Sequence, residues 1–134
     1  MSAVIDASVV VSGLIAAAPE GDWALEVLQR PNLAAPQLLP FEVLNVLGRL
    51  EHGGRIDTTL ASFARLEFSD LPIALVPLEA LADRVWALRS AITAYDASYV
   101  ALAEALELPL ATLDERLARA PGPKCAFLAP PDIS

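Results

Sequence analysis

The sequence predicts a three-layer α/β/α domain built on a central, mainly parallel sheet of about five strands. Short apolar runs that suit buried strands alternate along the chain with longer segments of helical spacing, as they do where helices connect parallel strands. Hydrophobic residues make up 55% of the chain, which fits strands covered on both faces. The length of 134 residues suits a single domain. The first apolar run lies at the N-terminus and is followed directly by an acid, Asp6.

In the first half of the chain, apolar runs and turn residues define two strands and four helices. Strands are expected over residues 3–5 and 32–36, and helices over residues 7–18, 23–30, 40–51 and 57–68. The valines of the first helix also suit a strand, but this segment is long and ends at Pro19. We expect Asp22 to cap the second helix and Asp57 to start the fourth. Pro40 is tolerated in the first turn of the third helix, which should stop at Gly53.

The second half repeats the alternation. Strands are expected over residues 72–76, 110–113 and 126–128, and helices over residues 78–92, 93–106 and 115–120. Thr93 and Asp96 have the spacing of a capping box, with Asp in the position that more often holds Glu. Because strands and helices alternate throughout, right-handed crossovers should make the strands parallel and place helices on both faces of the sheet.

Composition restricts the possible partners and location. The formal net charge of −8 repels nucleic acid in general, so any RNA contact must come from local basic side chains and bound metal. An acidic surface also suits a basic protein partner. No apolar run approaches the roughly 18 residues of a membrane span. The apolar stretch after Asp6 has no Lys or Arg before it, unlike a signal peptide, so we expect a cytoplasmic protein.

The chain contains one histidine and one cysteine, His52 and Cys125. A zinc site is improbable, because zinc prefers several such ligands and these two lie far apart in sequence. His52 sits at an expected helix end, where it suits the helix dipole. Cys125 is expected to be a small, half-buried side chain that forms no intrachain disulfide.

Four acids stand at the ends of strands or the starts of helices: Asp6, Glu42, Asp96 and Asp114. Each has a structural interpretation. Asp6 and Asp114 could cap helices, and Glu42 could be an ordinary surface residue. Asp96 lies in a first helical turn, where the helix dipole favours a negative charge. Together they suggest more, because Asp6 and Asp114 leave the same edge of the sheet if their strands are neighbours. The apolar residues around Glu42 would carry its charge toward that edge, where it needs compensation.

Clustered carboxylates predict a site for Mg²⁺, with Mn²⁺ able to substitute, because hard oxygen ligands specify these cations. Such an ion can lower the pKa of a bound water and neutralise phosphoryl oxygens. Ser8 and Thr112 could donate hydrogen bonds to the carboxylates or to water. Asn45 and Arg49 lie three and seven residues after Glu42 on its helical face and could contact a phosphate, although Arg49 could equally be solvated.

These acids lie in four stretches that resemble the motifs of PIN-domain ribonucleases, specifically the VapC toxins of toxin–antitoxin pairs. The stretches are residues 4–8, 40–47, 95–103 and 112–117, and the third is the most specific. All four acids of the pattern are present.

The resemblance implies a metal-dependent endoribonuclease that cleaves structured RNA such as tRNA or rRNA, forms a homodimer and is silenced by a VapB-type antitoxin. It implies that Asp6, Asp96 and Asp114 bind metal and that Glu42 binds metal, directly or through water, or activates water. Arg49 and Arg116 are candidates for RNA contact. Two alternatives remain: a PIN-like module with a vestigial pocket, and a receiver-like phospho-acceptor domain, although Asp6 lacks the acidic neighbour that such domains use.

Overall fold

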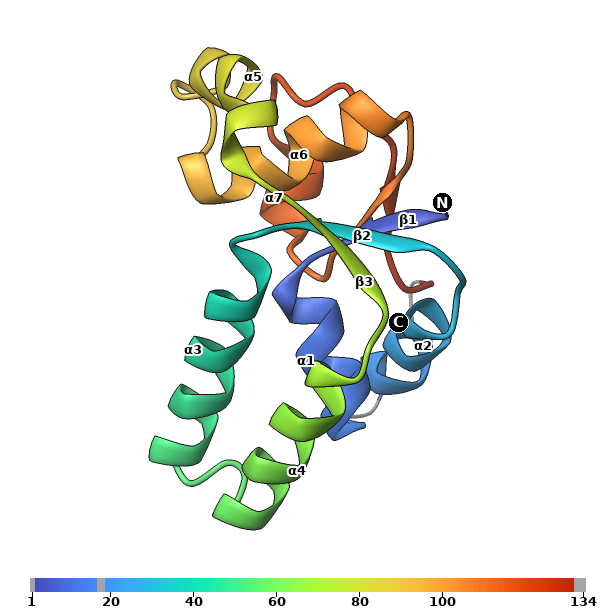
Figure 1. Cartoon of the computed structure of the whole chain (residues 1–134), viewed down its shortest axis with the longest axis vertical. Helices are drawn as coiled ribbons and strands as arrows, with labels where there is room; N and C mark the ends of the chain where they lie inside the picture. Colours follow the sequence, from blue (N-terminus) through green and yellow to red (C-terminus); the bar gives the residue numbers. More distant parts are fainter. Residues whose placement is uncertain (1, 17–18, 132–134) are drawn as a thin grey trace.

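The computed structural model describes residues 2–16 and 19–131, which form a five-stranded sheet with helices on both faces (Figure 1). In chain order the elements are β1 (Ala3–Ile5), α1 (Ala7–Ile15), α2 (Glu20–Leu28), β2 (Leu33–Pro36), α3 (Leu39–His52), α4 (Thr58–Ser69), β3 (Ile73–Val76), the 3₁₀ helix η1 (Leu78–Ala80), α5 (Ala82–Ala87), α6 (Ala94–Leu106), β4 (Leu110–Ala111), α7 (Glu115–Arg119) and β5 (Phe127–Leu128). The predicted α/β order is confirmed. The predicted end of the first helix, at residues 17–18, lies outside the described residues.

The strands are all parallel and lie in the order β3-β2-β1-β4-β5. The chain starts at the centre of the sheet, builds outward through β2 and β3, and returns to the other side of β1 with β4 and β5. Ile5 pairs with Ala111, so β1 and β4 end side by side. Where the strand order reverses in this way, the carboxyl ends of the strands border a crevice. Asp6 and Asp114 follow these two strands, as the sequence predicted.

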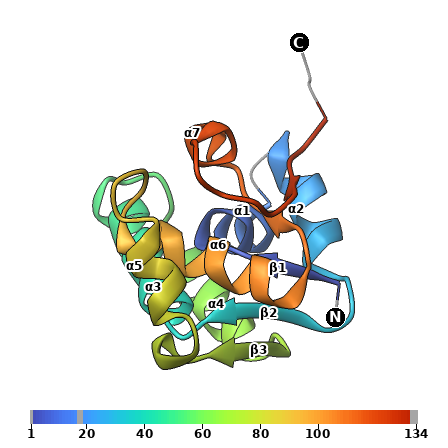
Figure 2. The same cartoon turned by 90° about the horizontal axis from the view of Figure 1, so that it is seen from above.

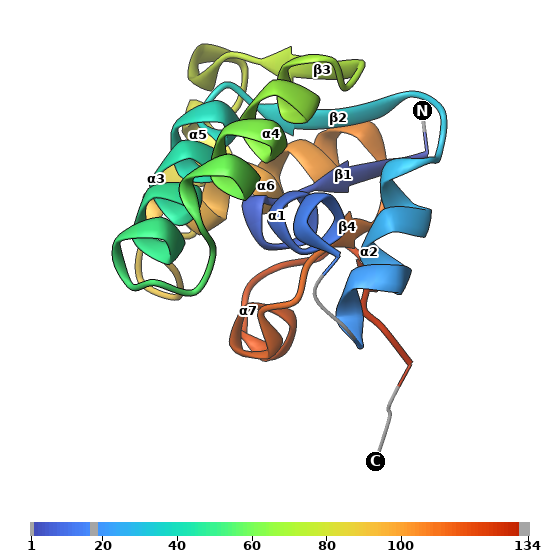
Figure 3. The same cartoon turned by 90° about the horizontal axis from the view of Figure 1, so that it is seen from below.

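Helices α1 to α4 lie on one side of the sheet, and α5 and α6 lie on the other (Figures 1 and 2). Seen from below, α1 lies between α2 and the hairpin of α3 and α4, and it packs against all three helices (Figure 3). Helix α6 packs on β1, β2 and β4. Every residue of β1 is fully buried, because helices cover both of its faces. None of the described helices has the length and apolar character needed to cross a bilayer.

Two predicted helices differ in detail. Helix α2 begins at Glu20, earlier than predicted, and Asp22 lies in its first turn instead of capping it. Gly21 permits this start, since a Cβ there would lie 2.7 Å from the backbone carbon of Ala16. The helix predicted over residues 78–92 is replaced by η1 and the short α5. Arg89 helps to end α5, because its side chain donates to the Trp86 carbonyl at 2.9 Å and stacks 4.2 Å from the centre of the indole ring.

An ion-pair network joins α5, α6 and the segment that leads into β5. Arg84 Nε donates to Glu104 Oε1 at 2.6 Å, and the Lys124 amide donates to Glu104 Oε2 at 2.7 Å. A second Arg84 nitrogen donates to the Gly122 carbonyl at 3.0 Å. The guanidinium of Arg84 holds the pKa of Glu104 below its ordinary value. Because the carboxylate accepts donors from two segments, it ties the last part of the chain to α6.

Replacement of this carboxylate, Glu104→Gln, should lower the free energy of unfolding at pH 7 by about 1 kcal/mol, since Arg84 remains one-third exposed and solvent screens the pair. The pKa of Glu104 is lower in the folded chain, so this stability is present above the ordinary pKa and lost as the pH falls through the folded value. Denaturant titration at several pH values measures the difference. Glu115→Gln is the control, because that carboxylate is 85% exposed and lies 3.6 Å from Arg119. Equal effects of the two substitutions would contradict the assignment.

Candidate metal centre

Asp6 lies at the end of β1, where its side chain is only 9% exposed. It caps α1 by accepting the Val9 amide at 3.2 Å, so the capping interpretation holds. The Ser8 hydroxyl donates to the same oxygen at 2.6 Å, and the Thr112 hydroxyl donates to the other at 2.5 Å. A carboxylate has about four acceptor positions, so these three hydrogen bonds leave capacity for one more partner.

The two hydroxyls join the ends of β1 and β4. Ser8 Oγ accepts the Leu113 amide and Thr112 Oγ1 accepts the Asp114 amide, each at 3.0 Å, while both hydroxyls donate to Asp6. The prediction that Ser8 and Thr112 donate to a carboxylate is confirmed, and that carboxylate is Asp6. Because Thr112 also holds the backbone of Asp114, the hydrogen bonds fix the position of one acid relative to the other.

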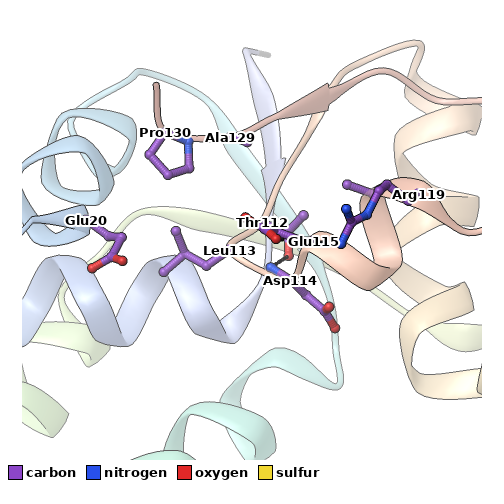
Figure 4. Close-up of a pocket in the computed structure, with 9 residues that line it drawn as sticks. Glu20, Thr112, Leu113, Asp114, Glu115, Arg119, Ala129 and Pro130 are labelled. Carbon is purple, nitrogen blue, oxygen red and sulfur yellow. Dashed lines mark hydrogen bonds and ion pairs between the residues drawn. The ribbon is translucent and has the colours of Figure 1, made fainter. Parts of the chain in front are cut away.

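Asp114 follows β4 and caps α7, with Oδ1 accepting the amides of Arg116 at 3.0 Å and Leu117 at 3.3 Å. Figure 4 shows Thr112 and Asp114 beside a hollow, with Glu20 on the far side from Arg119. The Asp114 side chain is 38% exposed. Arg116 Nε lies 3.9 Å from Asp114 Oδ1, but its side chain is 93% exposed, so it offsets little of the acidic charge.

Asp96 lies in the first turn of α6, which Thr93 caps by accepting the Asp96 amide at 3.1 Å. This is one of the two hydrogen bonds of the predicted capping box, the one that Thr93 accepts. The hydrogen bond fixes the start of α6, and with it the position of a half-buried carboxylate.

Glu42 lies in the first turn of α3 and has a partner that the sequence analysis missed. The Tyr99 hydroxyl, on α6, donates to Glu42 Oε1 at 2.6 Å. Tyr99 is 2% exposed, as expected for a core aromatic, but its hydroxyl makes a polar contact that its sequence position does not suggest. The available signal was its place three residues after Asp96, on the same face of the helix.

The pKa values of the acids show that their charges interact. Burial raises the pKa of Asp6 despite the hydroxyls that lower it. Burial raises the pKa of Glu42, and the charges of Asp96 and Asp6 raise it further. The pKa of Asp96 is raised by burial and by the charge of Asp114. Asp6, Asp96 and Asp114 therefore each act on another acid of the set, as expected for carboxylates from distant parts of the chain that share one edge of the sheet.

These residues fit a hard divalent cation in kind, because the four acids supply oxygen ligands. As they stand, the described side chains do not gather three acidic, histidine or cysteine groups around one point. Glu42, Asp96 and Asp114 are each half-buried, whereas Asp6 is buried.

A second hollow, of about 410 Å³, adjoins Glu42 and is also lined by Ala7, Asn45, Val46 and Arg49. The prediction that Asn45 and Arg49 share a face with Glu42 is confirmed. Both side chains are exposed. Of the other predictions, His52 lies at the end of α3 and Cys125 is partly buried, as expected.

Comparison with known proteins identifies relatives across almost the whole chain. Residues 3–123 match the family model of the PIN domain. Ribonuclease VapC9 of Mycobacterium tuberculosis is 32% identical over 128 residues, which cover 96% of this chain and 98% of that protein.

Solved structures share the fold. PAE2754 of Pyrobaculum aerophilum is 25% identical, with a TM-score of 0.71 over 96% of this chain and 89% of its own. VapC20 of Mycobacterium tuberculosis, described as a toxin that cleaves the sarcin-ricin loop, has a TM-score of 0.65 at 15% identity, covering 87% and 92% of the two chains. A toxin–antitoxin complex of Klebsiella pneumoniae has a TM-score of 0.59 at 22% identity, covering 90% and 93%.

Substitution of the central acid, Asp6→Asn, should raise the melting temperature of the metal-free protein at pH 7 by about 2–6 °C, because it removes a buried charge. The pKa of Asp6 is higher in the folded chain, so wild-type stability increases as the pH falls from 7 through that raised pKa. The advantage of Asp6→Asn should shrink over the same interval. Calorimetry in the presence of a chelator measures both effects.

Asp57→Asn is the matched control, because Asp57 caps α4 at an exposed position and asparagine caps equally well. A destabilised Asp6→Asn protein, or an advantage that does not depend on pH, would show that Asp6 stabilises the fold as a charged group.

Proposed function

This chain belongs to the PIN-domain family and to its VapC ribonucleases, and we propose that it hydrolyses phosphodiester bonds of structured RNA with Mg²⁺ held by Asp6, Glu42, Asp96 and Asp114. Mn²⁺ is expected to substitute. The observation that carries the proposal is geometric: the hydroxyls of Ser8 and Thr112 hold Asp6 and the backbone of Asp114 together at the reversal of strand order, and the charges of Asp6 and Asp96 reach Glu42. We place this activity in the cytoplasm.

Each acid would contribute according to its surroundings. Asp6 is immobilised by Ser8 and Thr112 and would anchor the ion. Asp96 and Asp114 are half-buried and would complete its ligands, with one oxygen of Asp114 retained for the α7 cap. Glu42 would bind the ion, directly or through water, or accept a proton from the attacking water. A bound Mg²⁺ supplies a more acidic water and neutralises charge on the phosphoryl oxygens.

Recognition of RNA needs local cations, because the chain as a whole carries a net charge of −8. Arg49 and Asn45 line the hollow beside Glu42, and Arg116 lies beside Asp114, so each arginine is near one of the acids. We propose that both arginines contact phosphates of the substrate. The target described for VapC20, which shares this fold, supports a structured RNA substrate.

A basic antitoxin and a second copy of this chain are the proposed protein partners. The Klebsiella pneumoniae complex supports an antitoxin, and the acidic surface of this chain complements a basic one. Exposed apolar side chains on the α3–α4 hairpin offer contact area: Leu44 is 49% exposed, Phe63 61% and Leu66 56%. Such side chains on one projecting unit are typical of interaction surfaces.

The purified, antitoxin-free chain should cleave total RNA in the presence of Mg²⁺, and EDTA should abolish the cleavage. Asp96→Asn should lower the rate by about 100-fold or more, because it removes a charged ligand. Arg49→Ala and Arg116→Ala should raise KM about 3- to 10-fold with unchanged metal affinity. Sequencing of the RNA ends would identify the target.

The control for this assay is Asp70→Asn, which removes a carboxylate before β3, at the opposite end of that strand from the site. Cleavage that resists EDTA or survives Asp96→Asn unchanged would refute the metal-dependent mechanism. A protein that binds no Mn²⁺ in calorimetry would instead support the vestigial PIN-like module.

Co-expression with the small protein of the neighbouring reading frame should yield a stable complex in which RNA cleavage is inhibited. Phe63→Asp should weaken that complex at least 10-fold while leaving cleavage by the free chain intact, because Phe63 lies outside the acidic site. Sedimentation velocity on the free chain tests the homodimer. A neighbouring protein that neither binds nor inhibits would contradict its assignment as the antitoxin.

A further inference from the structure

We propose that Tyr99 is a positioning residue for Glu42: its hydroxyl holds one oxygen of the carboxylate and leaves the other facing the metal centre. The inference rests on the proposed metal-dependent cleavage and extends it to a residue outside the four acids. It assigns a polar function to a side chain that sequence pattern alone would place in the core.

The contact is short and well defined. Tyr99 donates to Glu42 Oε1 at 2.6 Å across 57 positions of sequence, and its side chain is 2% exposed. A phenol has one proton to donate, so the hydroxyl is committed to this carboxylate. Because the ring is locked by the surrounding core, the oxygen it holds has little freedom to rotate.

The other oxygen of Glu42 remains available. Within the described residues, Tyr99 supplies the hydrogen bond to this carboxylate, and no buried side-chain oxygen is left without a partner. Glu42 Oε2 is therefore accessible to solvent. A carboxylate held at one oxygen offers the second to a cation or to a water molecule, and it is oriented before either arrives.

The same hydrogen bond connects α3 to α6, two helices whose main packing partners differ. Helix α3 packs on α1 and α4, whereas α6 packs on the sheet and α5 (Figure 1). Asp96 and Tyr99 lie one turn apart on α6. One helix thus supplies both an acid of the site and the donor that orients the acid of α3, so Tyr99 fixes how the two acids face each other.

The test compares Tyr99→Phe with Tyr95→Phe. Both substitutions remove only a hydroxyl from α6, but Tyr95 is 64% exposed. Mn²⁺ affinity by titration calorimetry and the kinetics of RNA cleavage are measured for each. We expect Tyr99→Phe to weaken Mn²⁺ binding or lower kcat by about 10- to 100-fold. KM for RNA should stay within about twofold, and Tyr95→Phe should match the wild type in every measurement.

The Glu42→Ala background separates positioning from structure. If Tyr99 acts through Glu42, then Tyr99→Phe should cause no further loss of Mn²⁺ affinity once Glu42 is absent. Both tyrosine variants retain the ring and are expected to fold, which thermal unfolding verifies.

Three results would overturn the inference. If Tyr99→Phe behaves like Tyr95→Phe, Tyr99 has no positioning role, while the proposed cleavage is unaffected. A loss that persists at full size in the Glu42→Ala background shows that the hydroxyl serves the fold instead. A wild-type chain that neither binds Mn²⁺ nor cleaves RNA removes the proposed function, and this inference fails with it.

Discussion

The hydrogen bonds that hold Asp6 at the junction of β1 and β4 organise the rest of the site. Asp6 is almost completely removed from water, and burial raises its pKa. It remains there because Ser8, Thr112 and the Val9 amide donate to it. The two hydroxyls also accept amides from the segment after β4. One buried carboxylate therefore aligns the two strand ends and fixes the backbone that carries Asp114.

Structural and functional interpretations of the acids are compatible in this fold. Asp6 and Asp114 cap α1 and α7, and Asp96 lies in the first turn of α6. A cap uses part of the acceptor capacity of a carboxylate and leaves the remainder for another partner. The mutual repulsion of these acids is a cost that the protein bears without a metal, and a divalent cation would convert it into binding free energy.

Much of this arrangement was predictable from sequence because it depends on local pattern. Apolar runs followed by acids located β1 and β4, and the alternation of elements implied that these strands run parallel. Ser8 lies two residues after Asp6 and Thr112 lies two residues before Asp114, and these positions suggested that their hydroxyls donate to carboxylates. Contacts made at a distance were beyond such reasoning. The place of Tyr99 one turn after Asp96 puts it on the face of the site but does not identify Glu42 as its partner, and nothing within residues 78–92 reveals that Arg84 would turn to Glu104.

The central claim is that Asp6, Glu42, Asp96 and Asp114 converge on one divalent ion. The most direct test is a crystal structure of the wild-type chain grown with Mn²⁺, with anomalous diffraction data. We predict one or two anomalous peaks at the ends of β1 and β4, with an Asp6 oxygen and at least two of the other acids as ligands at about 2.1 Å. The claim would be contradicted if crystals grown at saturating Mn²⁺ showed no anomalous peak at this edge, or if the bound ion did not have Asp6 as a ligand.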